Sequence, residues 1–250
     1  MKTWFISFCL GILPCFLQAD DGAAAYKRGD YVQAVELWQA QAQQEGVHAD
    51  LLAALGNAEW KLGRKGRAVL CWERALLLNP RDPVALAGIQ HAKSVGGTDR
   101  PTPTWYETYA SFLTSDSWLI IATLSFWTVI FCIVKPQLQG RPLSVWNERF
   151  LVIAATLLVL SIPGLLGAHT NAHRAVIKQS EIALRLTPTK LGESIQTTSE
   201  GDVVRTDRQL NGHVRVITGS GKAGWVRIEE IEPIWGGGLP NSPIDPQTAL

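Results

Sequence analysis

The sequence lacks an excess of charge of either sign. Its 250 residues carry 23 basic and 22 acidic side chains, a formal net charge of +1. The balance holds within its parts, with ten bases and ten acids over residues 20–100 and nine of each over residues 170–250. Nucleic-acid binding needs a strongly basic domain or face. The composition therefore predicts no nucleic-acid partner.

Cysteine is scarce, with four residues in the chain. Cys9 and Cys15 fall in an apolar N-terminal segment, Cys71 in a helical repeat and Cys132 in a second apolar run. Cys71 and Cys132 cannot readily meet, so no disulfide is expected.

Motifs that carry chemistry are also missing. No stretch has the pattern of a phosphate-binding P-loop or of a Gly-x-Ser-x-Gly elbow. His169 and His173 would share one helix face, but no Cys, Asp or Glu lies near them in sequence to complete a zinc site. We therefore predict no catalytic residue, no metal and no cofactor, and a protein that is not an enzyme.

Three apolar blocks stand out against this background. The first, "MKTWFISFCLGILPCFLQADD", has one early Lys, an apolar stretch and then an acidic start, which predicts a signal peptide over residues 1–19. An uncleaved anchor helix and a lipoprotein signal that uses Cys15 are the alternatives. The blocks at 117–134 and 150–168 carry no charge and are long enough to cross a hydrocarbon layer, so each predicts a transmembrane helix. Because neither holds an ionisable side chain, no ion path is predicted.

The loop between these two helices, residues 135–149, sets the predicted orientation. It carries Lys135, Arg141 and Arg149 against Glu148 alone, whereas the flank before residue 117 is acidic. Positive loops stay in the cytoplasm. The larger pieces on either side are therefore expected outside the cytoplasm, in the periplasm if the cell has one, at a bacterial inner (plasma) membrane.

A repeat with a period of 34 residues occupies residues 20–97. "GAAAYKRGDYVQAVELWQA" from Gly22 aligns with "GNAEWKLGRKGRAVLCWER" from Gly56 in Gly, Ala and aromatic positions. Glycine permits close helix approach, and Tyr26, Trp38, Trp60 and Trp72 fill the space between the hairpins. "DPVALAGIQHAKSVGG" begins a third repeat with only its first helix, a predicted cap.

These residues resemble the tetratricopeptide (TPR) repeat family. That resemblance implies a concave groove, lined by the first helix of each hairpin, that holds peptides of partner proteins. The residues carried over to the groove are Lys27, Asn57, Trp60 and Lys61. The alternative is that Trp60 only packs between helices and that Lys61 is a solvent-exposed charge without a binding role. Residues 98–116 are expected to link the repeats to the first apolar helix.

Residues 175–234 alternate polar and apolar side chains between turn signals, including Asn211-Gly212. About five strands in a small barrel are predicted. "LRLTP", "EGDVV" and "GKAGWV" make this part similar to bacterial SH3-type domains, which implies a peptide or peptidoglycan ligand. Trp225 is the candidate contact residue, with a core position as its alternative. The Gly- and Pro-rich tail, 235–250, is expected to be disordered.

The predicted fold class is a multidomain membrane protein with all-α TPR hairpins, two transmembrane helices and a small all-β SH3-like barrel. This order of parts resembles the BatE-type proteins of bacterial aerotolerance operons. The resemblance implies a non-enzymatic scaffold in the lipid bilayer whose partners are membrane-associated proteins, including Bat proteins with von Willebrand type A domains. The alternatives are a module that binds peptidoglycan and an accessory subunit of a membrane enzyme.

Overall fold

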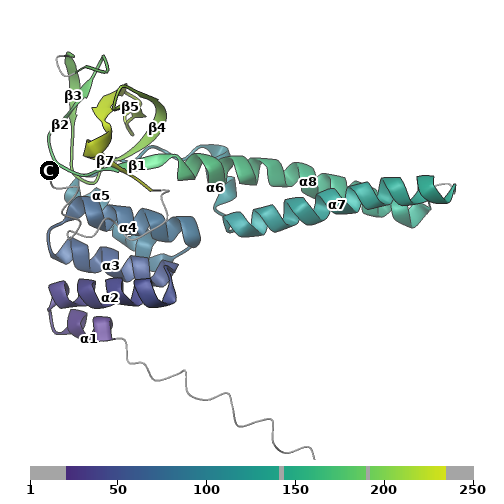
Figure 1. Cartoon of the computed structure of the whole chain (residues 1–250), viewed down its shortest axis with the longest axis horizontal. Coiled ribbons are helices and arrows are strands. Elements are labelled where there is room, and N and C mark those ends of the chain that lie inside the picture. Colours follow the sequence, from purple (N-terminus) through teal and green to yellow (C-terminus); the bar gives the residue numbers. More distant parts are fainter. Residues whose placement is uncertain (1–20, 141–143, 190–191, 235–250) are drawn as a thin grey trace, which may run out of the picture.

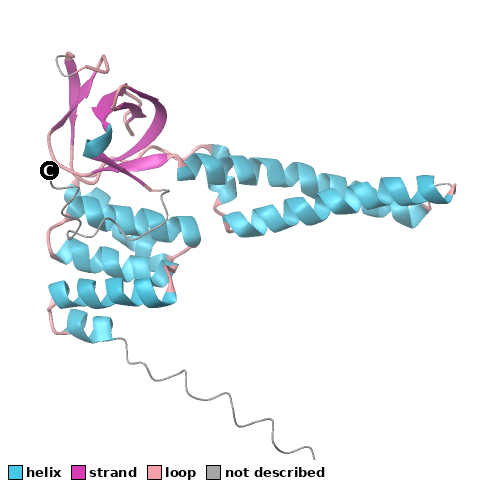
Figure 2. Cartoon of the chain, viewed as in Figure 1, coloured by secondary structure: helices cyan, strands magenta, loops and turns pink. Residues whose placement is uncertain are grey.

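The structure, a computed structural model, describes residues 21–140, 144–189 and 192–234. The predicted signal peptide and the predicted disordered tail lie outside the described residues. Eight α-helices and seven strands are described, and the strands gather at one end of the molecule (Figure 2).

Five helices stack at the N-terminal end (Figure 1). They are α1 (Asp21–Lys27), α2 (Tyr31–Glu45), α3 (Ala49–Lys61), α4 (Lys65–Leu78) and α5 (Pro83–Gly96). Asp82 caps α5, because its Oδ1 accepts a hydrogen bond of 2.7 Å from the Ala85 N–H, and Pro83 occupies the first helical position. The two predicted hairpins and the lone third helix are thus formed.

The segment predicted as a linker contains a helix of its own, α6 (Trp105–Ala110). It begins with a capping box: the N–H of Thr104 donates to Glu107 Oε2 at 2.6 Å. α6 lies against α8, since Tyr109 Oη donates to the Leu160 carbonyl at 3.1 Å. The connection is therefore packed.

Two long apolar helices follow, α7 (Ser115–Gln139) and α8 (Val145–Ala172). They run side by side and project away from the rest of the chain (Figure 1). Both are long and apolar enough to cross a membrane, and the share of the most apolar window that is buried is 17% for α7 and 22% for α8. The core helix of a soluble protein would be mostly covered, so this exposure is what a lipid-facing hairpin would show.

At the root of the hairpin, small residues allow close contact. The Trp118 ring lies on Gly164, where an added Cβ would come within 2.5 Å of the ring. The ring nitrogen of Trp118 donates to the Ala110 carbonyl at 3.0 Å, which ties α7 to α6. The hairpin is thus fixed to the rest of the chain.

The C-terminal part is an open antiparallel sheet with the order β3-β2-β6-β5-β4-β1-β7. Its strands are β1 (Arg174–Ile177), β2 (Ile182–Arg185), β3 (Ser194–Thr198), β4 (Val203–Leu210), β5 (His213–Ile217), β6 (Ala223–Arg227) and β7 (Ile231–Pro233). The β4–β5 turn is formed by Asn211 and Gly212, both with positive φ, as the sequence predicted.

Two features of the sheet differ from the prediction of five strands in a barrel. There are seven strands among the described residues, and β3 and β7 stand at opposite edges of an open sheet. β1 was not anticipated as a separate strand, because it follows α8 with no turn signal between them. β7 has only three residues, too few to show an alternating pattern.

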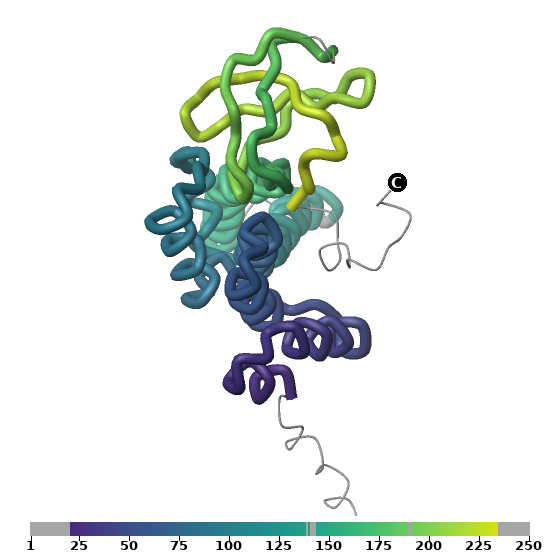
Figure 3. Tube along the Cα trace, turned by 90° about the vertical axis from the view of Figure 1, so that its left-hand side faces the viewer, coloured from purple at the N-terminus to yellow at the C-terminus, as the bar shows by residue number. Residues whose placement is uncertain are grey.

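The helical stack and the sheet share one hydrophobic core. Leu52, Val69 and Trp72 of the stack cluster with Val176 and Ile234 of the C-terminal part. Figure 3 shows the sheet lying directly on the stack, at the end opposite α1. We call this combined unit, residues 21–110 with 173–234, the body.

Polar contacts reinforce this junction. Arg74 of α4 donates from Nε to the Ile234 carbonyl at 3.2 Å and from Nη2 to the Pro233 carbonyl at 3.1 Å. Asp99 donates its N–H to Asp202 Oδ1 at 2.8 Å, and its carbonyl accepts from the Val203 N–H at 2.9 Å. The repeats and the sheet are therefore one packed unit.

Candidate functional site: the groove of the helical stack

The period of 34 residues produces two nearly identical aromatic pairs. Tyr26 and Trp38 have ring centroids 5.9 Å apart with planes at 38°, and Trp60 and Trp72 have centroids 5.7 Å apart with planes at 39°. Each Trp ring lies on the glycine of its own hairpin, Gly22 or Gly56 in turn. The predicted role of these glycines in close helix approach is confirmed.

Trp72 lies between two glycines. Its ring contacts Gly56 of α3 and Gly88 of α5. The ring nitrogen donates to Asn57 Oδ1 at 3.3 Å, which satisfies a donor that is almost wholly buried. α3, α4 and α5 are therefore held in register around one indole ring.

A groove of about 470 Å³ opens beside this ring. Its walls come from α1, α3, α4 and α5, and most of its lining belongs to the first helices of the repeats. The lining residues are Tyr26, Asn57, Trp60, Lys61, Trp72, Pro83, Val84, Ala87, Gly88 and His91.

The groove is apolar and aromatic with few charges. Lys61 is the cation of its lining, and no carboxylate is among the residues that line it. Trp60 contacts His91 edge to face, with ring centroids 5.4 Å apart. Burial raises the pKa of Tyr26, and the nearby Tyr31 raises it further, so its hydroxyl stays neutral. Such a surface suits an apolar peptide side chain rather than a highly charged ligand.

The predicted peptide-binding residues are divided between three places. Asn57, Trp60 and Lys61 come together in the groove. Lys27 is exposed on α1 and is not among the lining residues. Trp225 lies on β6 of the sheet, half-buried between buried neighbours Gly224 and Val226. Trp225 therefore faces away from the core of the sheet.

Sequence reasoning missed the contribution of α5 to the groove. His91 stands 34 residues after Asn57, so the repeat period itself could have indicated it. Pro83, Val84 and Ala87 had no such signal, because the residues 34 positions earlier, Ala49, Asp50 and Ala53, were not predicted to line the groove. Their place in the groove follows from how α5 packs on Trp72.

Among the described residues, no group of three or more His, Cys, Asp or Glu side chains could hold a metal ion. Cys71 is fully buried, and burial raises the pKa of its thiol to about 12, helped by the nearby Glu59 carboxylate. This thiol is protonated at neutral pH and is not a nucleophile.

Comparison with protein families finds a match for part of the helical stack. A tetratricopeptide repeat is found at residues 49–82. This TPR repeat covers α3, α4 and the turn that leads to α5, which includes the Gly56–Trp72 contact. Comparison with curated proteins and with solved structures gives no match.

TPR repeats are typically non-catalytic modules for protein–protein interaction, and no enzyme family is found. The matched range holds Asn57, Trp60 and Lys61, and the groove extends beyond it to Tyr26 and α5. The groove is therefore the candidate site for a protein partner.

Proposed function

We propose that this chain is a membrane-anchored, non-enzymatic scaffold whose TPR groove binds a segment of a partner protein. One observation carries the proposal: residues before and after the α7–α8 hairpin share a single core. The chain leaves the body at α7 and returns to it after α8. Two membrane crossings bring the chain back to the same side of the bilayer, whereas a single crossing would separate the two halves of the core. The exposed apolar surface of both helices supports the same reading.

The orientation in this proposal follows from the charges beside the helices. The segment between the two apolar runs, residues 135–149, is basic, and the C-terminal end of α7 and the N-terminal end of α8 lie far from the body. With this connection in the cytoplasm, the body lies on the outer face of a bacterial inner membrane. A signal peptide at residues 1–19 would agree with that location.

The partners in this proposal are membrane-associated proteins. Holding the groove close to the membrane confines it to a thin layer and raises its effective concentration toward such partners. Asn57, Trp60 and Lys61 would contact the partner, with Tyr26 and His91 beside them and Lys27 at the outer end. In the BatE-type version, the partners are Bat proteins with von Willebrand type A domains, and the sheet is an SH3-type module with Trp225 on its outer face.

Topology can be tested with reporters. A reporter that is active only in the cytosol should stay silent after Leu250 and be active when inserted at residues 141–143. A reporter that is active only outside the cytosol should give the reverse pattern. Cytosolic activity at Leu250 would reject the proposed location.

Partner binding can be tested with two matched charge reversals. Lys61→Glu changes the cation of the groove, and Lys93→Glu makes the same change on an exposed part of α5 that does not line it. The whole chain is purified in mild detergent from its own membranes with whatever proteins it holds. Lys61→Glu should lose the partner that the wild type and Lys93→Glu retain. Equal recovery from all three would rule out the groove as the binding site.

A further inference from the structure

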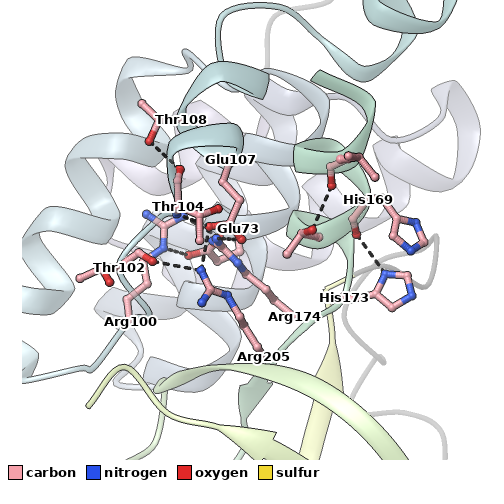
Figure 4. A network of polar contacts seen from close by, with 12 residues as sticks. Glu73, Arg100, Thr102, Thr104, Glu107, Thr108, His169, His173, Arg174 and Arg205 are labelled. Atoms are coloured by element: carbon pink, nitrogen blue, oxygen red, sulfur yellow. Dashed lines mark hydrogen bonds and ion pairs between the residues drawn. The ribbon is translucent and has the colours of Figure 1, made fainter. Parts of the chain in front are cut away.

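Five charged side chains meet where the body joins the hairpin (Figure 4). Glu107 of α6 contacts Arg174 at 3.1 Å and Arg205 at 2.7 Å. Close by, Glu73 of α4 contacts Arg100 at 2.8 Å. We call these residues, Glu73, Arg100, Glu107, Arg174 and Arg205, the root cluster.

The root cluster carries an excess positive charge in a partly buried place. Three guanidinium groups face two carboxylates, so one positive charge is unbalanced. The side chains of Glu107 and Arg174 are 1% and 4% exposed, whereas those of Arg205 and Arg100 are 25% and 32% exposed. An unbalanced charge in such surroundings is costly unless a counter-charge reaches it.

Two guanidinium N–H groups of the cluster make no hydrogen bond to another described residue. Arg174 Nε and Arg205 Nε are buried, and neither has a hydrogen-bond partner among the described residues. Arg205 uses Nη2 alone, for Glu107 and for the Thr102 carbonyl at 3.0 Å. Buried donors are nearly always paired, so this pair of N–H groups points to a missing acceptor.

Two further carboxylates, those of Asp99 and Asp202, accept hydrogen bonds from backbone N–H groups. Asp99 accepts from its neighbour's N–H, that of Arg100, at 2.9 Å and from the Ser220 N–H at 3.1 Å. Asp202 accepts from the N–H groups of Asp99 and Ser199 at 2.8 Å and 2.7 Å. Among the described residues, neither carboxylate forms an ion pair with an arginine of the root cluster, so neither is the missing acceptor.

We propose that the root cluster binds a phosphate group, which approaches from the more exposed side of Arg205 and Arg100, and that the side chains of Arg205 and Arg174 turn so that their buried Nε groups reach it. Guanidinium groups recognise phosphate through paired hydrogen bonds and stay charged at every pH of interest. A phosphate would bring both the missing acceptors and the missing charge.

The position of the cluster suggests where the phosphate comes from. α6 carries Trp105, which is 73% exposed, and Phe112 just after it is 57% exposed. Exposed aromatic rings beside an apolar helix favour the headgroup layer of a membrane. A phospholipid headgroup is thus the nearest source of phosphate, and this source rests on the proposed membrane anchoring. Free phosphate offers the same chemistry without it.

The test uses the whole chain with two changes at one residue. Arg205→Lys keeps the charge and the contact with Glu107 but loses the planar pair of donors, and Arg205→Gln loses both. Arg208→Gln is the matched control, because Arg208 lies on the same strand and its side chain is 76% exposed. Circular dichroism and the melting temperature without ligand show that each variant is folded.

One arm titrates inorganic phosphate, with sulfate-free chloride buffer as the reference, and follows the melting temperature. The wild type and Arg208→Gln should be stabilised, and Arg205→Lys should need about tenfold more phosphate for the same shift, the loss expected for a charged hydrogen bond. The other arm measures lipid retained in native mass spectra after exposure to phosphatidylglycerol or to a glycolipid that has no phosphate.

The outcomes distinguish a phospholipid headgroup from free phosphate as the ligand, and they distinguish failure of the phosphate site from failure of the proposed membrane anchoring. Retention of the phospholipid by the wild type, with loss in both Arg205 variants, identifies a headgroup site. Stabilisation by phosphate without lipid retention identifies free phosphate as the ligand. No effect of either, or equal effects in the Arg205 variants and the wild type, overturns the site. Failure to float with neutral vesicles would reject the membrane anchoring and leave the phosphate arm to decide the site.

Discussion

At Gly56 a missing side chain makes room for the Trp72 ring. A Cβ there would stand 2.5 Å from Trp72 Nε1, which is closer than packed atoms allow. The same ring also packs on Gly88, where an added Cβ would collide with Cε2, so little room is left for the ring to move. Because the side chain of Gly56 is a single hydrogen atom, α3 and α4 can approach each other this closely.

Gly56→Ala should therefore destabilise the chain by about 1–3 kcal/mol through overpacking. At an open helical site the same change would stabilise by roughly 1 kcal/mol, since Ala is the better helix former. The check is urea unfolding of the purified chain followed by circular dichroism. Trp72→Leu in the same chain should remove part of the penalty, and strictly additive effects of the two changes would refute the contact.

Glu107 holds two arginines at the root cluster with one carboxylate. Burial alone would raise the pKa of this carboxyl, but the hydrogen bond from the Thr104 N–H and the charges of Arg174 and Arg205 outweigh it, and the pKa is lowered. Folding therefore favours the ionised form. The stability that this group supplies is present above the pKa of an unfolded Glu, about 4.3, and is lost as the pH falls through the lower pKa of the folded state.

Glu107→Gln should cost about 3–5 kcal/mol at neutral pH, because it leaves buried guanidinium groups without their counter-charge. It should also flatten the loss of stability on acidification below pH ~4. Melting temperatures at pH 7, 5 and 3 measure both effects. Glu36→Gln, at an exposed position of α2, is the control and should change neither. An unchanged acid limb in Glu107→Gln would contradict the assignment.

At the scale of elements, α4 is the helix that joins the stack to the sheet. Its Arg74 reaches the Pro233 and Ile234 carbonyls and pairs with Glu232 at 3.4 Å. Gly66, at the start of the same helix, donates its N–H to Glu200 Oε1 at 2.8 Å. Two ends of α4 thus hold two separate parts of the C-terminal segment.

Arg74→Ala should therefore loosen both the stack and the sheet, by about 2–4 kcal/mol for the loss of a mostly buried, multiply bonded charge. Hydrogen–deuterium exchange should rise together in α4 and in β1 and β7. Arg28→Ala, an exposed arginine bonded to Gln33, should leave those regions unchanged. Faster exchange in α4 alone would mean that the stack and the sheet are independent after all.

The sequence predicts local structure well where a pattern repeats. The 34-residue period identified the helical hairpins and the close helix approach at Gly56, alternation identified β4, β5 and β6, and the uncharged runs identified α7 and α8. Element ends were less certain: the predicted apolar helices, 117–134 and 150–168, fall inside longer helices in the structure. Helix continues into polar flanks that an apolar count does not register.

Contacts between distant residues had no signal in the sequence. Glu107 and Arg205 are 98 residues apart, and each looks like an ordinary charged residue in its own segment. Arg74 and Ile234 are 160 residues apart. Such pairs depend on how whole elements dock, which one sequence read along its length does not reveal. The root cluster and the shared core were therefore not predicted, and only some of the residues that line the groove were predicted from the sequence.

At the scale of the whole molecule, the body and the hairpin follow different rules. The body buries its apolar residues in shared clusters, whereas the hairpin exposes large side chains along its length, among them Trp127 and Phe131. Contact between the two is concentrated at the root, where α6 lies on α8 and the ring nitrogen of Trp118 donates to the Ala110 carbonyl. The outer part of the hairpin can therefore be removed without opening the core of the body.

This separation can be tested by shortening the hairpin. Residues 124–158 are replaced by a five-residue Gly-Ser linker, which spans up to ~16 Å and so bridges helices that pack 8–10 Å apart. Trp118, Leu160 and Gly164 remain, and with them the contacts of the root. Long and short chains both begin with Met before Asp21, so that residues 1–20 contribute nothing to either.

In the proposed anchoring the hairpin buries its apolar surface in lipid, so the long chain should stay with membranes after alkaline carbonate washing. The short chain should be soluble without detergent, with the near-ultraviolet circular dichroism of the packed Trp60 and Trp72 rings retained. Carbonate-soluble long chain would mean that the hairpin does not span a bilayer. A short chain that aggregates with its aromatic signal lost would mean that the body depends on the whole hairpin, and that the stack and sheet do not hold each other.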